Sequence, residues 1–448
     1  MSRIQENYIK QLVLVLCIVV TIVPLFMYWT IPILEQSSAL NDMILLYFAS
    51  FASITGLLGL IMLFWQYVLG VRVVAKFFTN DFVWLNKVHQ NIGIWGMLFV
   101  FAHPLMALIS YGAYWFQLVL PEVWTPYDIY IMYGKIAISI VAVIWITSAL
   151  FRRNISYRWW KRIHFISYLV FPLVYMHSLN VGTTLLSTNL RYFWYLLGAI
   201  YPIIVAVSIL HHLGFFKRKG TIIKKEHLNT EVNRFTIELE RPINVFPGQF
   251  IYIQLSRGGE SHPFTVSHIV SGTQIMISPK KEGKFTKMLD TIVTPKKVFV
   301  DGPYGVFTAP AFEVDAPIVF LAGGIGITPF IETSKRVAQD KVLFYSEQTY
   351  TNAPFREELL RIYEAKSSQQ KGTKDADIVF AITKEKCDEK HCEEGRIDEK
   401  MLRKYLKKSL GGYQYYICGP KGFIKAMKQL LKSQGVRRQQ IQTEEFSL

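Results

Sequence analysis

Two apolar segments that each carry two histidines constrain this chain more than any other feature. The segments span residues 88–110 and 163–180. The first holds His89 and His103, fourteen positions apart, and the second holds His164 and His177, thirteen apart. At a helical rise of about 1.5 Å per residue, each pair of imidazoles is separated by about 20 Å, most of the ~30 Å hydrocarbon thickness of a bilayer. Two such helices side by side would present one histidine pair near each membrane face.

An imidazole in lipid is costly unless it has a partner, which favours a functional role for these histidines. A single transmembrane histidine often only hydrogen-bonds a neighbouring helix. Four at matched depths favour iron ligation, and two bis-histidine haems would use all four. Thirteen positions, however, leave His164 and His177 about 140° out of phase on a straight helix. Either Pro172 kinks the helix between them, or the two haems approach it from different sides.

Charge is unevenly distributed along the chain. Of 448 residues 51% are apolar, and the net charge is +16. Up to Phe216 there are twelve Lys and Arg against six Asp and Glu, so a membrane domain followed by a soluble part is expected. No nucleic-acid-binding motif accompanies the basic excess. Four cysteines, one of them in a membrane segment, do not form a disulfide framework, and no cleavable signal peptide is expected.

Six membrane spans are predicted from length and apolarity. They cover about residues 11–34, 42–69, 87–111, 129–151, 160–181 and 190–213. Basic residues gather between spans two and three, between four and five, and after six, whereas Arg191 is the one basic residue of the opposite loops. The positive-inside rule therefore predicts that both termini are cytoplasmic. His89 and His164 would then lie near the cytoplasmic face, and His103 and His177 near the outer face.

After Gly220 short β-type runs punctuated by Gly and Pro predict a small antiparallel barrel. The runs are 235–239, 250–255, 275–278 and 298–300. Within this region a His-Pro-Phe-Thr-Val-Ser motif, residues 262–267, precedes Gly283-Lys284-Phe285-Thr286. A glycine before a helix start, with Lys280 nearby, is compatible with a diphosphate cradle, although any turn can look alike.

From Pro317 on, alternating strands and helices predict a parallel sheet. The strand 318–322 runs into Gly323-Gly324-Ile325-Gly326-Ile327-Thr328-Pro329, a glycine-rich turn whose amides can meet nucleotide phosphates. A later strand, 415–417, opens into Cys418-Gly419-Pro420. Cys387 and Cys392 flank His391 in a charged loop. A metal site there is one interpretation, but without a fourth ligand a solvated loop is favoured.

Together these motifs resemble the membrane ferric reductase and NADPH oxidase superfamily over nearly the whole chain. The resemblance implies a multidomain membrane protein. A six-helix transmembrane haem bundle, 1–216, would precede a ferredoxin-reductase-like module. That module would comprise an antiparallel β-barrel FAD domain, 217–311, and an α/β NAD(P)H-binding domain, 312–448.

The resemblance also implies site residues. His89, His103, His164 and His177 would hold two haems b. The flavin would be bound by His262, Pro263, Phe264, Thr265, Lys280, Gly283, Lys284, Phe285, Thr286, Gly302 and Pro303. The nicotinamide nucleotide would be bound by Gly323, Gly324, Ile325, Gly326, Thr328, Pro329, Cys418, Gly419 and Pro420. Thr265 beside the isoalloxazine, Cys418 beside the nicotinamide and Phe446, an aromatic stacked on the flavin, would take part in catalysis.

Two departures from the family pattern affect the expected chemistry. The oxidases carry a basic residue near the outer haem, at the outer end of span two, but residues 37–43 hold no cation. No calcium-binding extension precedes span one, which implies an intrinsically active, prokaryote-like enzyme with no evident regulatory subunit. The fourteen-then-thirteen histidine spacing is more similar to the NADPH oxidases than to the fungal ferric reductases.

The implied activity is electron transfer from cytoplasmic NAD(P)H through FAD and two haems to an acceptor outside the plasma membrane. Oxygen, giving superoxide, is the expected acceptor, and a ferric chelate is the alternative. A redox-inert carrier or transporter with the same fold is a third interpretation. Glu347 would repel a 2′-phosphate if it pointed inward, whereas Arg356 is a candidate partner for that phosphate. Both NADH and NADPH are therefore expected to serve.

Overall fold

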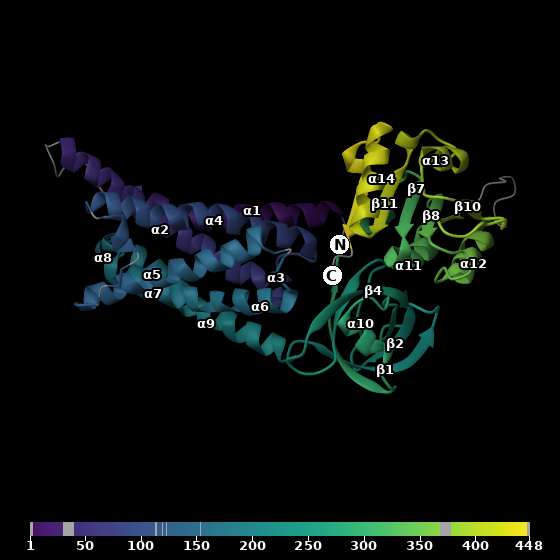
Figure 1. The fold of residues 1–448 in the computed structure, drawn as a ribbon, viewed down its shortest axis with the longest axis horizontal. Coiled ribbons are helices and arrows are strands. Elements are labelled where there is room, and N and C mark those ends of the chain that lie inside the picture. Colours follow the sequence, from purple (N-terminus) through teal and green to yellow (C-terminus); the bar gives the residue numbers. More distant parts are fainter. Residues whose placement is uncertain are drawn as a thin grey trace. The chain divides into compact units, whose positions relative to one another are not determined.

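The computed structural model describes residues 3–29, 40–112, 114–118, 120–121, 123–152, 154–367 and 378–445. The chain divides into two compact units, one of helices within Asn7–Leu210 and one of mixed structure from His211 on. Figure 1 shows the helices of the first unit and the barrel and sheet of the second.

Nine α-helices are described in the first unit and at its end. They are α1 (Arg3–Trp29), α2 (Leu40–Gly70), α3 (Arg72–Ala75), α4 (Phe82–Ser110), α5 (Pro126–Trp145), α6 (Tyr157–Phe165), α7 (Val170–Val181), α8 (Thr183–Ser187) and α9 (Leu190–His212). Two of these helices begin with polar capping residues. The Asp81 carboxylate accepts from the Trp84 N–H at 3.0 Å at the start of α4, and Thr125 and Asp128 form a capping box ahead of Pro126 in α5.

Four of the six expected spans are helices long and apolar enough to cross a membrane. Among the described residues these are Met43–Gly70, Phe82–Ser110, Pro126–Leu150 and Leu190–His212, with mean hydropathies of 2.0 to 2.1. The first expected span also lies in a helix, but the apolar part that is described, Asn7–Ile22, is shorter than a full span. The expectation of six membrane helices is thus confirmed for four.

The fifth expected span is not one continuous helix. A 3-10 turn, Ile166–Leu169, separates α6 from α7. A 3-10 helix rises about 2.0 Å and turns about 120° per residue. Four such residues stretch the thirteen positions from His164 to His177 to about 21 Å, the length of fourteen α-helical positions, and reduce the phase offset from about 140° to about 60°. The expected kink at Pro172 is not the cause, because this proline lies in the first turn of α7, where it is tolerated.

Two tyrosines from neighbouring helices stabilise this 3-10 turn. The Tyr67 hydroxyl of α2 donates to the Ser167 carbonyl at 2.6 Å, and the Tyr201 hydroxyl of α9 donates to the Tyr168 carbonyl. A break in the helical hydrogen-bond ladder leaves carbonyls without partners, which is costly in an apolar environment. The sequence therefore supplies hydroxyls where the turn exposes acceptors.

The expected antiparallel barrel is confirmed, with six strands in the closed order β1-β2-β5-β4-β3-β6. The strands are β1 (Arg218–His227), β2 (Asn233–Leu239), β3 (Phe250–Gln254), β4 (Ser261–Ile269), β5 (Gln274–Ile277) and β6 (Lys296–Tyr304). Alternate inward side chains such as Ile222, Phe235, Ile251 and Val300 are fully buried and form its core. The residues of the 262–267 motif lie within β4, opposite β3, and not in a turn.

The expected parallel sheet is also confirmed, in the order β10-β9-β8-β7-β11-β12. Its strands are β7 (Ile318–Gly323), β8 (Lys341–Glu347), β9 (Ile378–Ile382), β10 (Cys392–Glu394), β11 (Gln414–Gly419) and β12 (Ile441–Glu445). Short α10 (Lys284–Asp290) belongs to the barrel region, and four helices belong to the sheet: α11 (Thr328–Arg336), α12 (Arg356–Ser367), α13 (Glu399–Tyr405) and α14 (Lys421–Ser433).

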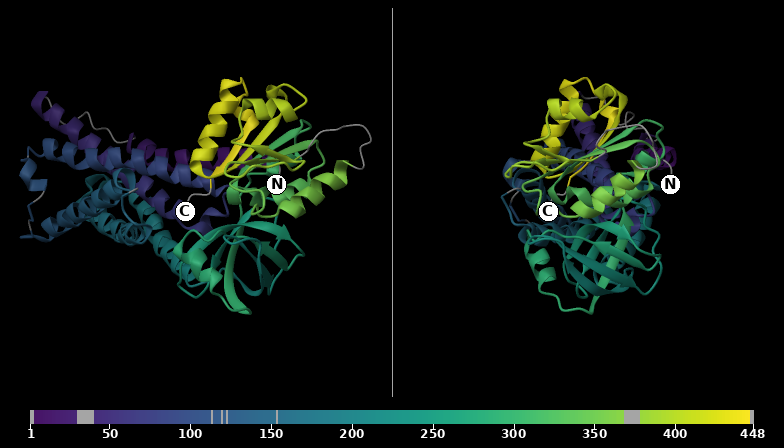
Figure 2. Two further views of the ribbon diagram at one scale, coloured as in Figure 1. Left: turned by 45° about the vertical axis from the view of Figure 1, so that its right-hand side comes forward. Right: turned by 90° about the vertical axis from the view of Figure 1, so that its right-hand side faces the viewer.

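Helices cover both faces of this sheet. Residues of α11 and α12 pack with Phe320 and Tyr345 on one face, and residues of α13 and α14 pack with Leu321 and Tyr415 on the other. The two helix layers are visible on either side of the strands in Figures 1 and 2. Because both faces are covered, β7 is buried at every residue, as its continuous apolar run requires.

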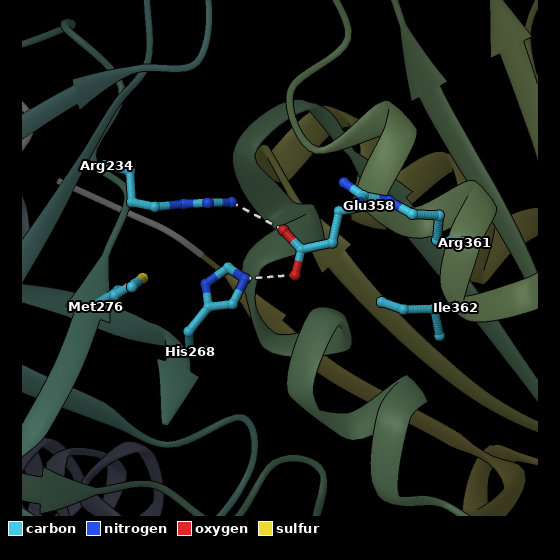
Figure 3. A pocket seen from close by; sticks show the side chains of 6 residues that line it. All are labelled: Arg234, His268, Met276, Glu358, Arg361 and Ile362. Carbon is cyan, nitrogen blue, oxygen red and sulfur yellow. Dashed lines mark hydrogen bonds and ion pairs between the residues drawn. The ribbon is translucent and has the colours of Figure 1, made fainter. Parts of the chain in front are cut away.

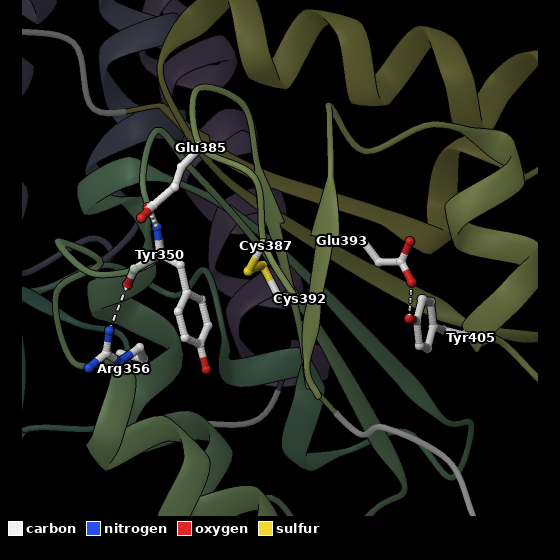
Figure 4. The surroundings of a disulfide bond; sticks show 7 residues. All are labelled: Tyr350, Arg356, Glu385, Cys387, Cys392, Glu393 and Tyr405. Atoms are coloured by element: carbon white, nitrogen blue, oxygen red, sulfur yellow. Dashed lines mark hydrogen bonds between the residues drawn. A yellow bond between two sulfur atoms is a disulfide. The ribbon is translucent and has the colours of Figure 1, made fainter. Parts of the chain in front are cut away.

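Cys387 and Cys392 form a disulfide, with Cα atoms 6.0 Å apart (Figure 4). From the sequence, this segment was interpreted either as a metal site or as a solvated loop. Neither interpretation included a disulfide between the two cysteines. The bridge closes the loop between β9 and the edge strand β10. Both cysteines pack against the core on the α11 and α12 side of the sheet.

Candidate functional site

The four histidines of the first unit lie in two facing pairs. The ring centres of His89 and His164 are 6.3 Å apart, and those of His103 and His177 are 6.1 Å apart. The ring planes make angles of 54° in the first pair and 80° in the second. In both pairs one ring comes from α4, and its partner comes from α6 or α7.

The spacing of both pairs fits an iron between the rings. A metal–imidazole bond of about 2.0–2.1 Å, with about 1.1 Å from nitrogen to ring centre, separates two axial imidazoles by about 6.3 Å. Among the described residues no group of three or more His, Cys, Asp or Glu side chains gathers as a metal site. Each facing pair could supply two imidazole ligands to one metal ion.

The two pairs are held in different ways. Nδ1 of His103 lies 2.8 Å from the Ala52 carbonyl, and Nδ1 of His177 lies 2.9 Å from the Tyr130 carbonyl. Because a carbonyl can only accept, both Nδ1 atoms carry the proton, which leaves each Nε2 lone pair for a metal. Nδ1 of His89 and of His164 is buried without a hydrogen-bond partner.

An aromatic stack holds His164 instead. The Trp160 ring lies 4.9 Å from the His164 ring at 25°, and the Trp160 indole N–H donates to the Ser148 hydroxyl at 3.0 Å. Ser148 lies in a π-helical turn, Ile146–Leu150, that follows α5. Such turns are common at functional sites.

In the second unit the barrel brings two expected flavin motifs together. The His262 ring of β4 stacks on Phe285 of α10 with ring centres 4.0 Å apart, and Phe264 lies 6.0 Å from Phe285. The Thr265 hydroxyl is buried without a hydrogen-bond partner, and so is the Ser261 hydroxyl. Because orphaned buried hydroxyls are costly, a polar edge of a bound cofactor beside Thr265 would satisfy this group. Pro263 lies opposite Tyr252 of β3.

The residues expected at a diphosphate lie around the start of α10. Gly283 precedes the helix and its N–H donates to the Thr286 hydroxyl at 2.9 Å, so Thr286 serves the helix start. Lys284 is the first residue of α10. Lys280 pairs with Glu282 at 2.8 Å and with Glu231 at 3.3 Å. Burial lowers the pKa of Lys280, but these two carboxylates outweigh it and raise the pKa, so the side chain stays cationic.

Gly302 and Pro303 lie near the end of β6, against β3. Gly302 has φ +137°, and a Cβ there would lie 3.3 Å from the Phe250 carbonyl oxygen. Only glycine allows strands β3 and β6 to approach in this way. Phe446, the aromatic residue expected on the flavin, lies outside the described residues.

The expected nicotinamide residues meet at the carboxyl ends of two adjacent strands. Cys418 of β11 lies opposite Ala322 of β7, so the glycine-rich turn and Cys418-Gly419-Pro420 are neighbours. A Cβ on Gly326 would lie 2.4 Å from the Cys418 carbonyl oxygen, and one on Gly323 would lie 2.9 Å from the Phe423 ring. The glycines are therefore needed for contact between the two turns.

The remaining residues of this turn lead into α11. Gly324 has φ +55°, Ile325 lies in a 3-10 turn, and the Thr328 hydroxyl donates back to the Ile325 carbonyl at 3.1 Å. Pro329 occupies the first turn of α11, as a helix start favours. Strand order departs from chain order at β7 and β11, and the crevice beyond such a point is where open α/β sheets bind nucleotides.

Glu347 closes one side of this edge at the end of β8. The Tyr345 hydroxyl donates to Glu347 at 3.1 Å, and a Cβ on Gly324 would lie 3.9 Å from the same carboxylate oxygen. Burial raises the pKa of Glu347 and outweighs the hydrogen bonds from the Tyr345 hydroxyl and the Gln348 N–H, which lower it. Arg356 donates to the Tyr350 carbonyl at 3.0 Å and stacks over the Tyr350 ring (Figure 4), so its guanidinium is already engaged.

A polar network joins the barrel to the α/β domain. Arg234 of β2 and His268 of β4 point at Glu358 of α12, at 2.8 Å and 2.6 Å (Figure 3). Lys335 of α11 adds a third contact at 3.0 Å. Burial alone would raise the pKa of Glu358, but the hydrogen bond and charge of His268, followed by those of Lys335, lower it to about 2. The carboxylate therefore stays ionised and ties the two domains together.

Three family models match successive parts of the chain. A ferric reductase like transmembrane component matches residues 55–175, an FAD-binding domain matches 220–308, and an oxidoreductase NAD-binding domain matches 320–429. This order is the architecture of the NADPH oxidase and ferric reductase superfamily. The chain belongs to that superfamily. Its successive parts are accordingly a ferric reductase like transmembrane component, an FAD-binding domain and an NAD-binding domain.

Curated relatives match this superfamily member over about half of its length. A flavohemoprotein of Rhodopirellula baltica is 27% identical over 256 residues, 51% of this chain and 60% of the relative. A glycine betaine monooxygenase reductase subunit of Chromohalobacter salexigens is 25% identical over 240 residues, 48% and 60% of the two chains. The chain thus spans about 60% of the length of these relatives.

Solved structures match as well. The FAD/NAD-binding domain of a nitric oxide dioxygenase from Vibrio cholerae is 20% identical, with a TM-score of 0.43 over 51% of this chain and 98% of that one.

Sequence reasoning missed residues near His103 and His177 in this superfamily member. A Cβ on Gly56 would lie 2.8 Å from Nδ1 of His103, and one on Gly134 would lie 2.9 Å from Nδ1 of His177. Lys135, next to Gly134, is a cation inside α5 whose ammonium donates to the Leu120 carbonyl at 2.8 Å. The sequence could have pointed to Lys135, because a charge within an apolar helix is unusual. The roles of Gly56 and Gly134 become visible only in the packed helices.

Proposed function

We propose that this chain carries electrons from cytoplasmic NAD(P)H across a membrane to oxygen, giving superoxide on the outer side. FAD and two b-type haems are the carriers in this proposal. The haems would be held by His89 with His164 and by His103 with His177. The two facing histidine pairs are the observation that carries the proposal.

The spacing of the pairs supports a relay. His89 and His103 are fourteen positions apart on the continuous helix α4, which is about 21 Å. One electron jump over most of a bilayer is divided in two by sites at this separation. The flavohemoprotein relatives, whose name joins a flavin with a haem, agree with this assignment.

Bound flavin would supply the exchange of one hydride for two single electrons, and bound haem would supply one-electron carriage. Each facing histidine pair would hold one haem, and the haem of the outer pair would supply single electrons to an acceptor on the outer side. This suits a small diffusible acceptor such as oxygen.

In the second unit, we assign Thr265 to the flavin edge and Cys418 to the nicotinamide. Burial, followed by the charge of Glu444, raises the pKa of the Cys418 thiol well above its usual range. The thiol would therefore stay neutral and offer a soft contact surface for the nicotinamide ring, not a nucleophile. Phe446 would stack on the flavin. The proposed boundaries of the three domains remain 1–216, 217–311 and 312–448.

The proposed location is the plasma membrane, with several spans and both termini in the cytoplasm. The distribution of basic loop residues supports this orientation. The reductase module would then draw on cytoplasmic nucleotide, and the pair His103 and His177 would face outward.

For the nucleotide we propose that NADH and NADPH both serve. Glu347 stands where it can accept from ribose hydroxyls and disfavours a 2′-phosphate. Its raised pKa weakens that repulsion. Steady-state kinetics with each nucleotide tests the assignment, and a thousandfold preference would contradict it.

The deciding experiment measures the product. Purified protein with nucleotide and FAD is expected to reduce cytochrome c in a reaction that superoxide dismutase suppresses. Turnover with ferric chelates but without superoxide would instead establish the second candidate, ferric-chelate reduction. The transmembrane family match and the absence of a cation in residues 37–43 favour that candidate.

Haem content separates both enzymes from a redox-inert carrier. We expect a Soret band with two haems per chain that responds to added nucleotide. His103→Leu is expected to remove one haem and retain the other. A colourless purified protein, or a His103→Leu variant with both haems, would refute the proposed relay.

A further inference from the structure

The outer histidines dock on the backbone of neighbouring helices. His103 of α4 reaches the Ala52 carbonyl of α2, and His177 of α7 reaches the Tyr130 carbonyl of α5. Both carbonyls lie inside regular helices, where a carbonyl already accepts the N–H four residues later. A second donor must therefore approach from the side of the helix.

The residue four positions later is glycine in both helices, Gly56 and Gly134. Side chains in a helix tilt toward its N-terminus, so the side chain at position i+4 covers the carbonyl at position i. Here a Cβ would lie 2.8 Å from Nδ1 of His103 and 2.9 Å from Nδ1 of His177. Cβ atoms essentially never come this close to other atoms, so alanine would push either imidazole away from its carbonyl.

The inner pair has only a loose form of this arrangement. Gly70 follows Gly56 by fourteen positions on α2 and faces His89, which precedes His103 by fourteen positions on α4. A Cβ on Gly70 would lie 3.8 Å from the His89 ring, an ordinary contact. Nδ1 of His89 has no hydrogen-bond partner, and neither has Nδ1 of His164. The Gln66 carbonyl, four residues before Gly70, interacts with His89 but accepts no close hydrogen bond, so among the described histidines the close backbone hydrogen bond is found only in the outer pair.

We propose that Gly56 and Gly134 are positioning residues that fix the tautomer and basicity of the outer ligands and make the outer haem site chemically different from the inner one. The inference rests on the proposed haem ligation. An Nδ1–H bonded to a carbonyl makes its imidazole a stronger donor at Nε2, and loss of such a partner typically weakens metal binding about 10- to 100-fold. Stronger donation stabilises the ferric state and lowers the midpoint potential of that site.

The test compares alanine variants of the purified full chain in detergent. Gly56→Ala and Gly134→Ala are expected to retain one haem per chain instead of two, or to keep both with the outer potential raised. Gly70→Ala, on the same helix as Gly56, is the matched control and is expected to keep two haems and both potentials. Alanine favours helix formation more than glycine does, so a loss of haem would not reflect a weaker helix.

The possible outcomes distinguish failure of this inference from failure of the proposed function on which it rests. A wild type without haem would refute the proposed function. A wild type with two haems, together with unchanged haem content and potentials in Gly56→Ala and Gly134→Ala, would refute the positioning role alone. If neither variant can be purified, redox titration of the wild type decides: a lower potential for the outer haem than for the inner haem supports the inference, and equal potentials or a higher outer potential overturn it.

Discussion

Replacing Glu358 by glutamine tests whether the barrel and the α/β domain depend on one carboxylate. Glu358 accepts from Arg234, His268 and Lys335, at 2.8, 2.6 and 3.0 Å. Glutamine keeps the shape and one acceptor oxygen but removes the charge. We therefore expect Glu358→Gln to unfold at a lower temperature and to reduce the flavin more slowly, because hydride transfer needs both domains in register.

The size of the effect follows from the pKa. Lowering the pKa of Glu358 from 4.5 to about 2 corresponds to about 3.4 kcal/mol at 1.36 kcal/mol per pH unit. The side chain is 22% exposed, and solvent screening reduces this to about 1.5–2 kcal/mol. For a domain of this size, such a loss lowers the melting temperature by about 3–8 °C.

The pH dependence has a defined sign. Because the folded-state pKa is depressed, the stabilisation is complete above about pH 4.5 and is lost as the pH falls toward 2. Scanning calorimetry of the wild type and of Glu358→Gln at pH 7 and pH 3 measures the difference in melting temperature and its dependence on pH. The matched control is Glu357→Gln, whose side chain is 79% exposed and lies 3.8 Å from Arg356. Equal melting temperatures for the two variants at pH 7 would refute the reasoning.

Three further changes probe the nucleotide edge and the disulfide. Glu347→Gln should raise kcat/KM for NADPH relative to NADH about tenfold, since about 1.4 kcal/mol of charge repulsion is removed; an unchanged ratio in steady-state kinetics would place the carboxylate away from the ribose. Gly326→Ala should slow flavin reduction at least about a hundredfold at unchanged FAD content, because its Cβ would lie 2.4 Å from the Cys418 carbonyl oxygen; stopped-flow absorbance tests this, and wild-type rates would contradict it. Serine at Cys387 and Cys392 should cost about 2 kcal/mol of unfolding free energy in calorimetry, the closure entropy of a short loop, and full stability would show that the bridge is dispensable.

Local patterns predicted most of the architecture. Histidine spacing gave the two pairs, and the strand patterns gave the barrel and the parallel sheet. Each of these depends on residues close in sequence or on a periodicity that the chain repeats.

Features set by packing between distant segments could not be predicted. Gly56 gains its meaning from His103, forty-seven positions away on another helix. The Cys387–Cys392 bridge was not predicted, because the sequence indicated only a metal site or a solvated loop at this place. The phase mismatch between His164 and His177 was visible, but its cause, tighter winding at residues 166–169, depends on hydroxyls from two other helices.

This tightly wound turn makes the segment sensitive to length. Adding or deleting one residue between His164 and His177 would rotate one ring by about 100° relative to the other and shift it by at least about 1.5 Å. Exchanges among apolar side chains leave that spacing unchanged. In this chain we therefore expect a one-residue insertion or deletion in the interval to be far more damaging than an exchange of its apolar side chains.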